Sequence, residues 1–265
     1  MFAELLLSAE GVLATFLCLY LGIITPFLIA GQSTYRLTLT MAVASGIAFW
    51  SFIDLMDDAA LLGVNQGFSG GLSHILLAGL FAAALLGLFW LDRRFGAPGK
   101  ARRPVALTYG TALLVAAGIG FHSLGEGIEI GSLIGYYYAL NPSSFNLVTA
   151  IGGLGSGVAY LLHKYLEGFI VGVFAATLTT RPSRGFILGL LAGVPTAMGL
   201  ALAFVTPVDS TVFFGIGAAA MIYIECKLVP TLFTRGRTMV FVVALLLGFF
   251  LMYLAGLFHS YTTIF

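Results

Sequence analysis

Histidine and glutamate recur at one spacing in two apolar stretches of the chain. His122 precedes Glu126 by four residues, and His163 precedes Glu167 by the same interval. A spacing of four places both side chains of a pair on one face of a helix. Imidazole nitrogen and carboxylate oxygen are ligands of zinc, iron, manganese, cobalt and cadmium, so the two pairs predict a site for a divalent transition metal.

The elements that carry these residues must be membrane helices. Of the 265 residues, 60% are hydrophobic and 9% are charged, whereas a soluble domain carries about 25% charged residues. The apolar runs are long and continuous, which excludes the alternating pattern of a barrel. We expect one all-α polytopic domain over residues 1–265, embedded in the plasma (inner) membrane. The net charge of +1 gives no indication of a nucleic-acid partner.

Eight apolar segments are long enough to span a bilayer, which requires about 20 residues. The connections between them are short, so neighbouring helices should be antiparallel. The predicted spans are about 11–30, 38–62, 72–91, 105–135, 147–178, 185–206, 211–232 and 238–259.

Lysine and arginine are distributed unevenly between these connections. Ten of the twelve lie in alternate connections, and an excess of positive charge is typical of cytoplasmic loops. We therefore expect four connections to be cytoplasmic and, because the number of spans is even, both termini to be outside. The ten residues are Arg36, Arg93, Arg94, Lys100, Arg102, Arg103, Arg181, Arg184, Arg235 and Arg237.

The other two lysines and most of the acids lie inside predicted spans. Each charge near the bilayer centre costs roughly 2.5–3.5 kcal/mol on insertion scales, so these residues must face one another, water or a metal. The two helices with the His–Glu pairs run antiparallel, which brings His122 level with Glu167. By the same argument Glu126 is level with His163, and four ligands converge near mid-membrane. The simpler interpretation is that His122 with Glu167, and Glu126 with His163, form structural hydrogen-bonded pairs.

The two motifs together resemble a known family. The pattern H-S-x-G-E-G at 122–127, followed by H-K-x-x-E-G at 163–168, resembles the fourth- and fifth-helix signatures of the ZIP (Zrt/Irt-like) metal transporters. Segments 52–59, 193–199 and 221–230 resemble the second, sixth and seventh helices of that family. The resemblance thus covers nearly the whole chain, although only the two central motifs are specific.

The resemblance implies a fold and a set of ligands. The fold is three helices, a central pair and three further helices, related as inverted repeats, with both termini outside. By the resemblance, His122, Glu126, His163 and Glu167 are the ligands of the transport site. A residue from the start of the third span would complete it; the candidates are Ser73 and His74.

Three positions depart from the family pattern. Many members hold a second metal ion through a residue after each histidine and a Glu before the proline of the sixth helix. In this chain those positions are Ser123, Lys164 and Val194. A protonated lysine cannot bind a metal, but it can supply positive charge between Glu126 and Glu167. We therefore expect a single-metal site in which Lys164 replaces the second ion.

Four other intramembrane acids are candidates for additional roles. Asp57, Asp58 and Glu129 would line an entrance for the metal; the alternative for the two aspartates is the water-exposed end of an outer vestibule. Glu225 either takes part in transport or forms a structural ion pair. Its expected partner in that pair is Lys227 or Lys164.

Together these features favour a transporter that moves divalent metal, zinc first, toward the cytoplasm by alternating access. The metal is then the substrate, and we expect no cofactor and no enzymatic activity. Two alternatives stay open: an intramembrane metal-dependent hydrolase, which lacks an H-E-x-x-H motif here, and a non-transporting metal sensor. A homodimer is compatible with the sequence.

Overall fold

The computed structural model describes residues 2–30, 33–62, 67, 71–95, 107–140, 143, 146, 153–178, 182–203, 208–232 and 238–259. Within these residues the chain forms eight α-helices and no β-strand, and each helix is long and apolar enough to cross a membrane. The helices are α1 (Phe2–Ala30), α2 (Thr34–Ala59), α3 (Gly71–Phe95), α4 (Tyr109–Leu140), α6 (Leu154–Thr177), α7 (Pro182–Ala203), α8 (Thr211–Leu232) and α9 (Thr238–His259).

The eight predicted spans are confirmed, with shifts at some ends. The bounds of α8 and α9 are those predicted, whereas α4 runs on to Leu140 and α1 begins as early as Phe2. The prediction that the fifth span begins at residue 147 is corrected, because α6 begins at Leu154. Gly153 precedes it with φ +97°, a conformation that favours glycine and does not continue a helix. Residues 147–152 lie outside the described part of the chain.

Side-chain caps begin α2, α4 and α8, and the Thr108 hydroxyl accepts a hydrogen bond at 3.1 Å from the backbone N–H of Thr111 in the first turn of α4. The hydroxyl of Ser33 accepts a hydrogen bond at 3.4 Å from the backbone N–H of Arg36 in the first turn of α2. The carboxylate of Asp209 accepts one at 3.1 Å from the backbone N–H of Thr211, where α8 begins. Such caps satisfy N–H groups that have no partner within the helix.

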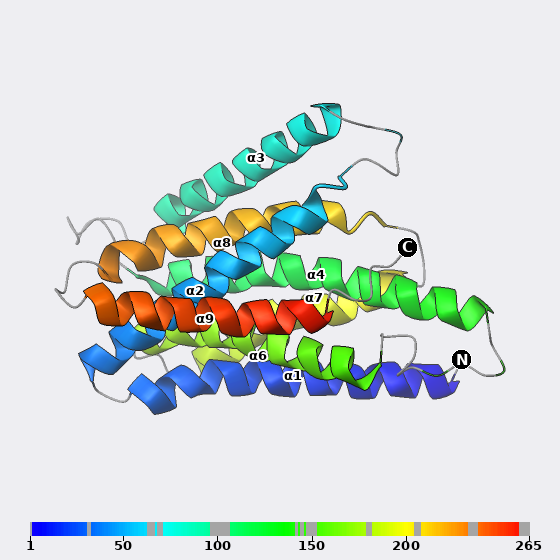
Figure 1. Cartoon of the computed structure of the whole chain (residues 1–265), viewed down its shortest axis with the longest axis horizontal. Helices are drawn as coiled ribbons and strands as arrows, with labels where there is room; N and C mark the ends of the chain where they lie inside the picture. Colours follow the sequence, from blue (N-terminus) through cyan, green and yellow to red (C-terminus); the bar gives the residue numbers. More distant parts are fainter. Residues whose placement is uncertain are drawn as a thin grey trace.

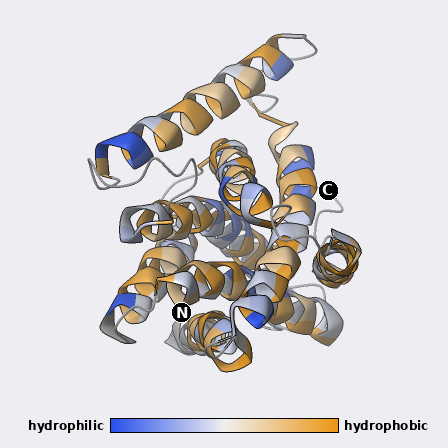
Figure 2. Cartoon of the chain, turned by 90° about the vertical axis from the view of Figure 1, so that its left-hand side faces the viewer, coloured by the Kyte–Doolittle hydropathy of each residue, from blue (hydrophilic) through white to orange (hydrophobic). Residues whose placement is uncertain are grey.

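The helices form an elongated bundle in which α4 and α6 are central (Figure 1). In the membrane-spanning windows, 78% of the α4 residues and 72% of the α6 residues are buried, against 11% in α3. Figure 1 shows α3 diverging from the bundle, and Figure 2 shows hydrophobic residues over much of its length. The side chains most protected from lipid are therefore those of the central pair.

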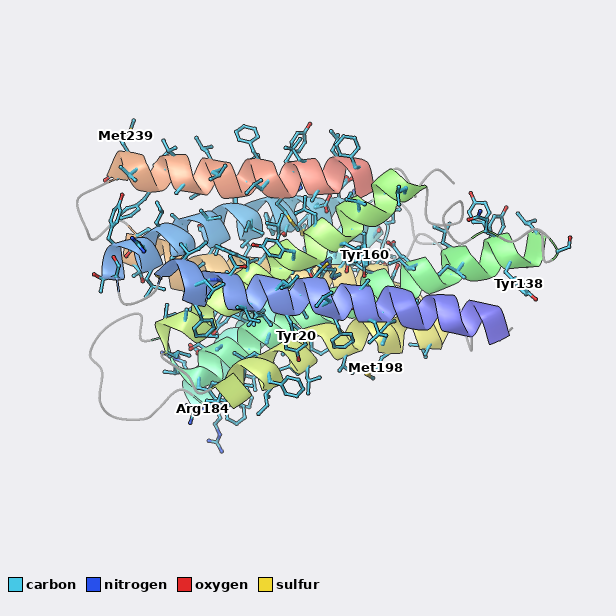
Figure 3. All side chains as sticks on the ribbon, turned by 90° about the horizontal axis from the view of Figure 1, so that it is seen from below. Tyr20, Tyr138, Tyr160, Arg184, Met198 and Met239 are labelled. Carbon is cyan, nitrogen blue, oxygen red and sulfur yellow. The ribbon has the colours of Figure 1, made fainter. Side chains whose placement is uncertain are left out.

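The neighbours of each helix define how the central pair is enclosed. Helix α1 packs along α6, and α7 packs along α4. Helix α2 packs against both α8 and α9, and α8 also contacts α3 and α4. Figure 3 shows Arg184 and Met239 toward one end of the bundle and Tyr138 at the other. The first end is the one that the lysine and arginine pattern predicts to be cytoplasmic.

Candidate metal site

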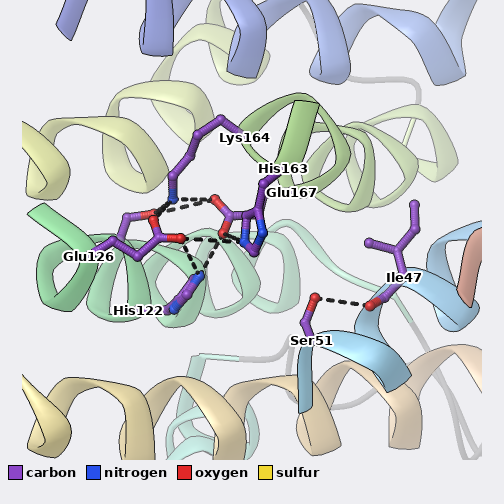
Figure 4. Close-up of polar contacts among 8 residues, drawn as sticks. Ile47, Ser51, His122, Glu126, His163, Lys164 and Glu167 are labelled. Atoms are coloured by element: carbon purple, nitrogen blue, oxygen red, sulfur yellow. Dashed lines mark hydrogen bonds and ion pairs between the residues drawn. The ribbon is translucent and has the colours of Figure 1, made fainter. Parts of the chain in front are cut away.

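The two His–Glu pairs meet between α4 and α6 as the antiparallel register predicts (Figure 4). The Nε2 atom of His122 lies 3.2 Å from Oε1 of Glu126 and 2.7 Å from Oε1 of Glu167. The Nε2 atom of His163 lies 3.4 Å and 3.1 Å from the same two oxygens. One ligand atom from each residue falls within 4.8 Å of the others, so the group could hold a metal ion.

The donor set and its spacing fit a small transition metal. Bonds of about 2.0–2.2 Å to a tetrahedral ion place neighbouring ligand atoms roughly 3.3–3.6 Å apart. Three of the four nitrogen–oxygen distances above, 3.1, 3.2 and 3.4 Å, are close to this range, and the fourth, from His122 to Glu167, is shorter at 2.7 Å. All four side chains are buried: His122 is 3% exposed, Glu126 4%, His163 2% and Glu167 0%. Burial keeps competing water and lipid away from whatever the group binds.

Lys164 lies on the side of the two carboxylates that faces away from the histidines. Its ammonium donates to Oε2 of Glu167 at 2.7 Å and to the hydroxyl of Ser123 at 2.9 Å, and it forms an ion pair with Oε2 of Glu126. Three oxygens thus surround a group that has three N–H donors. The side chain is 1% exposed, and the ring of Tyr160 lies 5.6 Å from Nζ. The predicted placement of Lys164 between the two glutamates is confirmed.

The charge of this group follows from its contacts. With neutral imidazoles, two carboxylates and one ammonium leave a net charge of −1, which attracts a cation. An unpaired charge at such a buried position would be strongly destabilising, and here each glutamate already has a positive neighbour. Lys164 therefore offsets one of the two buried carboxylate charges without a metal, and the remaining negative charge favours binding of a cation.

Glycines of the central helices let two outer helices approach the ligand-bearing backbone. Gly127 and Gly168 directly follow the two ligand glutamates. A Cβ atom at Gly127 would clash with the carbonyl oxygen of Thr196 on α7, and one at Gly168 would clash with the carbonyl oxygen of Leu19 on α1. Backbone therefore packs directly on backbone, as small residues permit between membrane helices. This contact fixes the position of each glutamate along the axis of the neighbouring helix.

The outer helices make the reciprocal contact through glycines of their own. Gly199 of α7 lies against the backbone two residues before and two residues after Glu126. Gly22 of α1 lies in the same way against the backbone on either side of Glu167. The backbone atoms concerned belong to Leu124 and Ile128 on α4, and to Tyr165 and Phe169 on α6. The same packing unit therefore occurs twice, once around each ligand glutamate.

The structure does not bring the candidates from the third span to this group. The hydroxyl of Ser73 donates to the carbonyl oxygen of Leu62. His74 is exposed on the first turn of α3. Neither residue belongs to the buried set of four, which offers four donor atoms without them.

The entrance candidates lie outside the group of four. Glu129 is half-buried one turn beyond Glu126 on α4, within 3.5 Å of the Ser210 hydroxyl. On α2, Asp58 is half-buried and Asp57 is exposed. These positions lie toward the end that the charge pattern predicts to be outside.

The ion pair expected for Glu225 is corrected. Glu225 accepts a hydrogen bond from Ser45 on α2 at 2.6 Å, while Lys164 pairs with Glu126 and Glu167. Lys227 lies two residues further along α8, and residues at that spacing point to different sides of a helix. Lys227 pairs instead with Asp92 on α3 at 2.5 Å.

The contact between Asp92 and Lys227 is the main feature that the sequence did not indicate. Thr111 of α4 also donates to Asp92, at 2.9 Å. The Lys227 ammonium lies 5.4 Å from the ring centre of Tyr223 and 5.9 Å from that of Phe89. This cluster joins α3, α4 and α8. The one available signal in the sequence was Asp92, a single acid at the end of an apolar span, and this signal does not identify the residue with which it pairs.

Comparison of the chain with models of protein families and with curated protein sequences finds no match. The resemblance of its two central motifs to the ZIP signatures therefore stands as a proposal. Within the described residues, the firm conclusion is a membrane-type bundle of eight apolar helices whose centre holds a buried His/Glu group able to bind a metal ion.

Proposed function

We propose that this chain transports a divalent transition metal across the membrane toward the cytoplasm, and that zinc is its main substrate. The observation that carries the proposal is the convergence of two buried histidines and two buried glutamates from antiparallel central helices. Intramembrane ionisable residues mark ion pathways by default, because their burial in lipid is otherwise so unfavourable. On the strength of the motif resemblance, we propose that the transporter is of the ZIP type, prokaryotic in pattern.

The helix contacts support a 3+2+3 arrangement with inverted repeats, which we propose for the whole bundle. Exchanging the first three helices with the last three, and α4 with α6, interchanges observed neighbours. The pair α1–α6 becomes α7–α4, and the pair α2–α9 becomes α8–α3. The duplicated glycine contacts around Glu126 and Glu167 obey the same exchange. Together with the charge pattern, this arrangement supports our proposal that both termini lie outside.

Inverted repeats around a midplane site support alternating access as the mechanism. The four ligands would then face the outside and the cytoplasm in turn. Asp57, Asp58 and Glu129 would receive the ion on the outer side. Glu225 lies one to two turns before the end of α8 and would be on the cytoplasmic side. We propose that one ion is carried at a time, because Lys164 holds the place of a second.

Transport in sealed vesicles tests the proposal directly. Purified protein in proteoliposomes should take up zinc, and both Glu167→Gln and His163→Ala should abolish uptake, since the first removes the negative charge of one ligand and the second removes a ligand nitrogen. Val158→Ala on the exposed face of α6 is the matched control and should transport normally. Wild-type rates in both ligand variants would refute the proposed site.

The same vesicles test a pH dependence. Histidine and glutamate must lose their protons to bind a metal, so protons compete with zinc for the site. Uptake measured at a fixed free zinc concentration should therefore fall as the external pH is lowered. Uptake that rises at acid pH would contradict this binding chemistry.

A further inference from the structure

We infer that Lys164 sets the metal selectivity of the site, because it restricts each ligand glutamate to one oxygen atom for the metal. The inference rests on the proposed function and deepens it by naming which divalent ions the site accepts. It starts from the way the carboxylate oxygens are divided between two sets of partners, which can be followed in Figure 4.

The two oxygens of each glutamate face opposite ways. Oε1 of Glu126 and Oε1 of Glu167 both lie within 3.4 Å of imidazole nitrogens. Oε2 of both residues faces the Lys164 ammonium, and Oε2 of Glu167 also lies 3.4 Å from the Ser123 hydroxyl. For Oε2 to turn toward an ion beside the histidines, it would have to leave a buried ammonium, which is strongly unfavourable.

The ion is therefore offered two nitrogens and two oxygens. Among the described residues, no other histidine, cysteine, aspartate or glutamate joins the group. Zinc readily takes four ligands of these kinds in a tetrahedron, and cobalt does the same. Manganese and magnesium favour six ligand atoms, most of them oxygen. The four side chains could supply six ligand atoms only if each glutamate bound through both of its oxygens. The site should therefore accept zinc and cobalt and discriminate against manganese and magnesium.

A purely electrostatic role for Lys164 predicts a different result. A fixed positive charge repels every divalent ion to a similar extent, because Coulomb energy depends on charge and distance. Removing that charge would raise the affinity for zinc and for manganese by similar factors and leave their ratio unchanged. A restriction on oxygen donors instead changes the ratio, so the ratio of affinities is the quantity to measure.

Cobalt provides a direct readout, since tetrahedral Co²⁺ absorbs visible light far more strongly than six-coordinate Co²⁺. Full-length protein is loaded with Co²⁺, its spectrum is recorded, and Zn²⁺ or Mn²⁺ is titrated in to displace the cobalt. The test variant is Lys164→Met, which removes the ammonium and keeps an unbranched side chain. Lys227→Met is the matched control, because it removes the buried lysine paired with Asp92, away from the site.

The wild-type protein and Lys227→Met should show the intense tetrahedral spectrum and a strong preference for zinc. In Lys164→Met the bands should weaken, and the ratio of manganese to zinc affinity should rise by about tenfold, equivalent to about 1.4 kcal/mol. Lys164→Arg, which keeps a cation, should retain the wild-type ratio. A weak six-coordinate spectrum in the wild-type protein would overturn the inference without any variant.

The inference and the proposed function fail in different ways. If Glu167→Gln abolishes cobalt binding, but the wild-type protein and Lys164→Met have the same ratio of manganese to zinc affinity, the inference alone is overturned. Absence of cobalt binding in the folded wild-type protein, or binding unaffected by Glu167→Gln, would overturn the proposed function itself.

Discussion

On α4 the residue after His122 is Ser123, and on α6 the residue after His163 is Lys164. Around them the two helices are packed alike, because Gly127 and Gly168 make equivalent contacts with α7 and α1. The difference lies in charge: one half contributes a hydroxyl and the other an ammonium, and the two are hydrogen-bonded at 2.9 Å. Equivalent packing thus fixes the backbone of the two halves and leaves their side-chain chemistry free to diverge.

The largest effect should come from replacing the ammonium by a carboxylate. Lys164→Asp leaves Glu126 and Glu167 without their buried cation, and losing one partner of such a pair destabilises a protein by about 3–5 kcal/mol. Stability should then depend on zinc, and two ions should bind per chain instead of one. Thermal unfolding with and without a chelator, together with metal analysis, measures both quantities.

Lys164→Arg is the control for this change, and it should remain stable in chelator with one zinc ion per chain. A folded Lys164→Asp protein that still binds a single zinc ion would show that the ammonium does not occupy a potential metal position.

A smaller effect is expected from the two glycines that follow the ligand glutamates. Gly127→Ala and Gly168→Ala each introduce a Cβ into backbone of a neighbouring helix, and overpacking of this kind costs about 1–3 kcal/mol. The two variants should lose stability and zinc uptake to similar extents. Gly79→Ala on α3 is the control, because nothing lies within 4 Å of an added Cβ there. If only one of the two central variants is impaired, the halves are not equivalent in packing.

The smallest effect should come from the hydroxyl that supports the ammonium. Ser123→Ala removes one of three oxygens around Lys164, and a hydrogen bond contributes roughly 0.5–1.5 kcal/mol. Ser51→Ala is matched to it in burial, but the Ser51 hydroxyl bonds only the Ile47 carbonyl of its own helix. The unfolding temperature of Ser123→Ala should be lower than that of Ser51→Ala. Equal temperatures would mean that the glutamates alone hold the ammonium.

Sequence periodicity and charge predicted the part of the site that depends on local geometry. The spacing of four fixed which side chains share a helix face, and the antiparallel register then paired His122 with Glu167 and Glu126 with His163. The eight spans followed from apolar length. These properties depend on neighbours along the chain or on consecutive spans, so they can be derived without three-dimensional coordinates.

Contacts between spans that are not consecutive could not be derived in this way. Lys227 and Asp92 are 135 positions apart, and Ser45 and Glu225 are 180 positions apart. Either lysine was a reasonable partner for Glu225 until the rotation of α8 was known. The position of α3 at the edge of the bundle could not be predicted either, because an apolar helix of the same composition can face lipid or protein.

The place of Lys164 has a consequence for how the protein is made. Lys164 and Glu167 lie on the same helix and are already within 2.7 Å of each other through one turn, so α6 can enter the bilayer with these two charges neutralised. On α4 itself Glu126 contacts His122 at 3.2 Å, and its lysine partner comes from α6. Because the counter-ion is part of the chain, assembly of the bundle does not require metal in the cell at the time of synthesis. If the chain imports metal as proposed, it can therefore mature during metal starvation, when uptake is most needed.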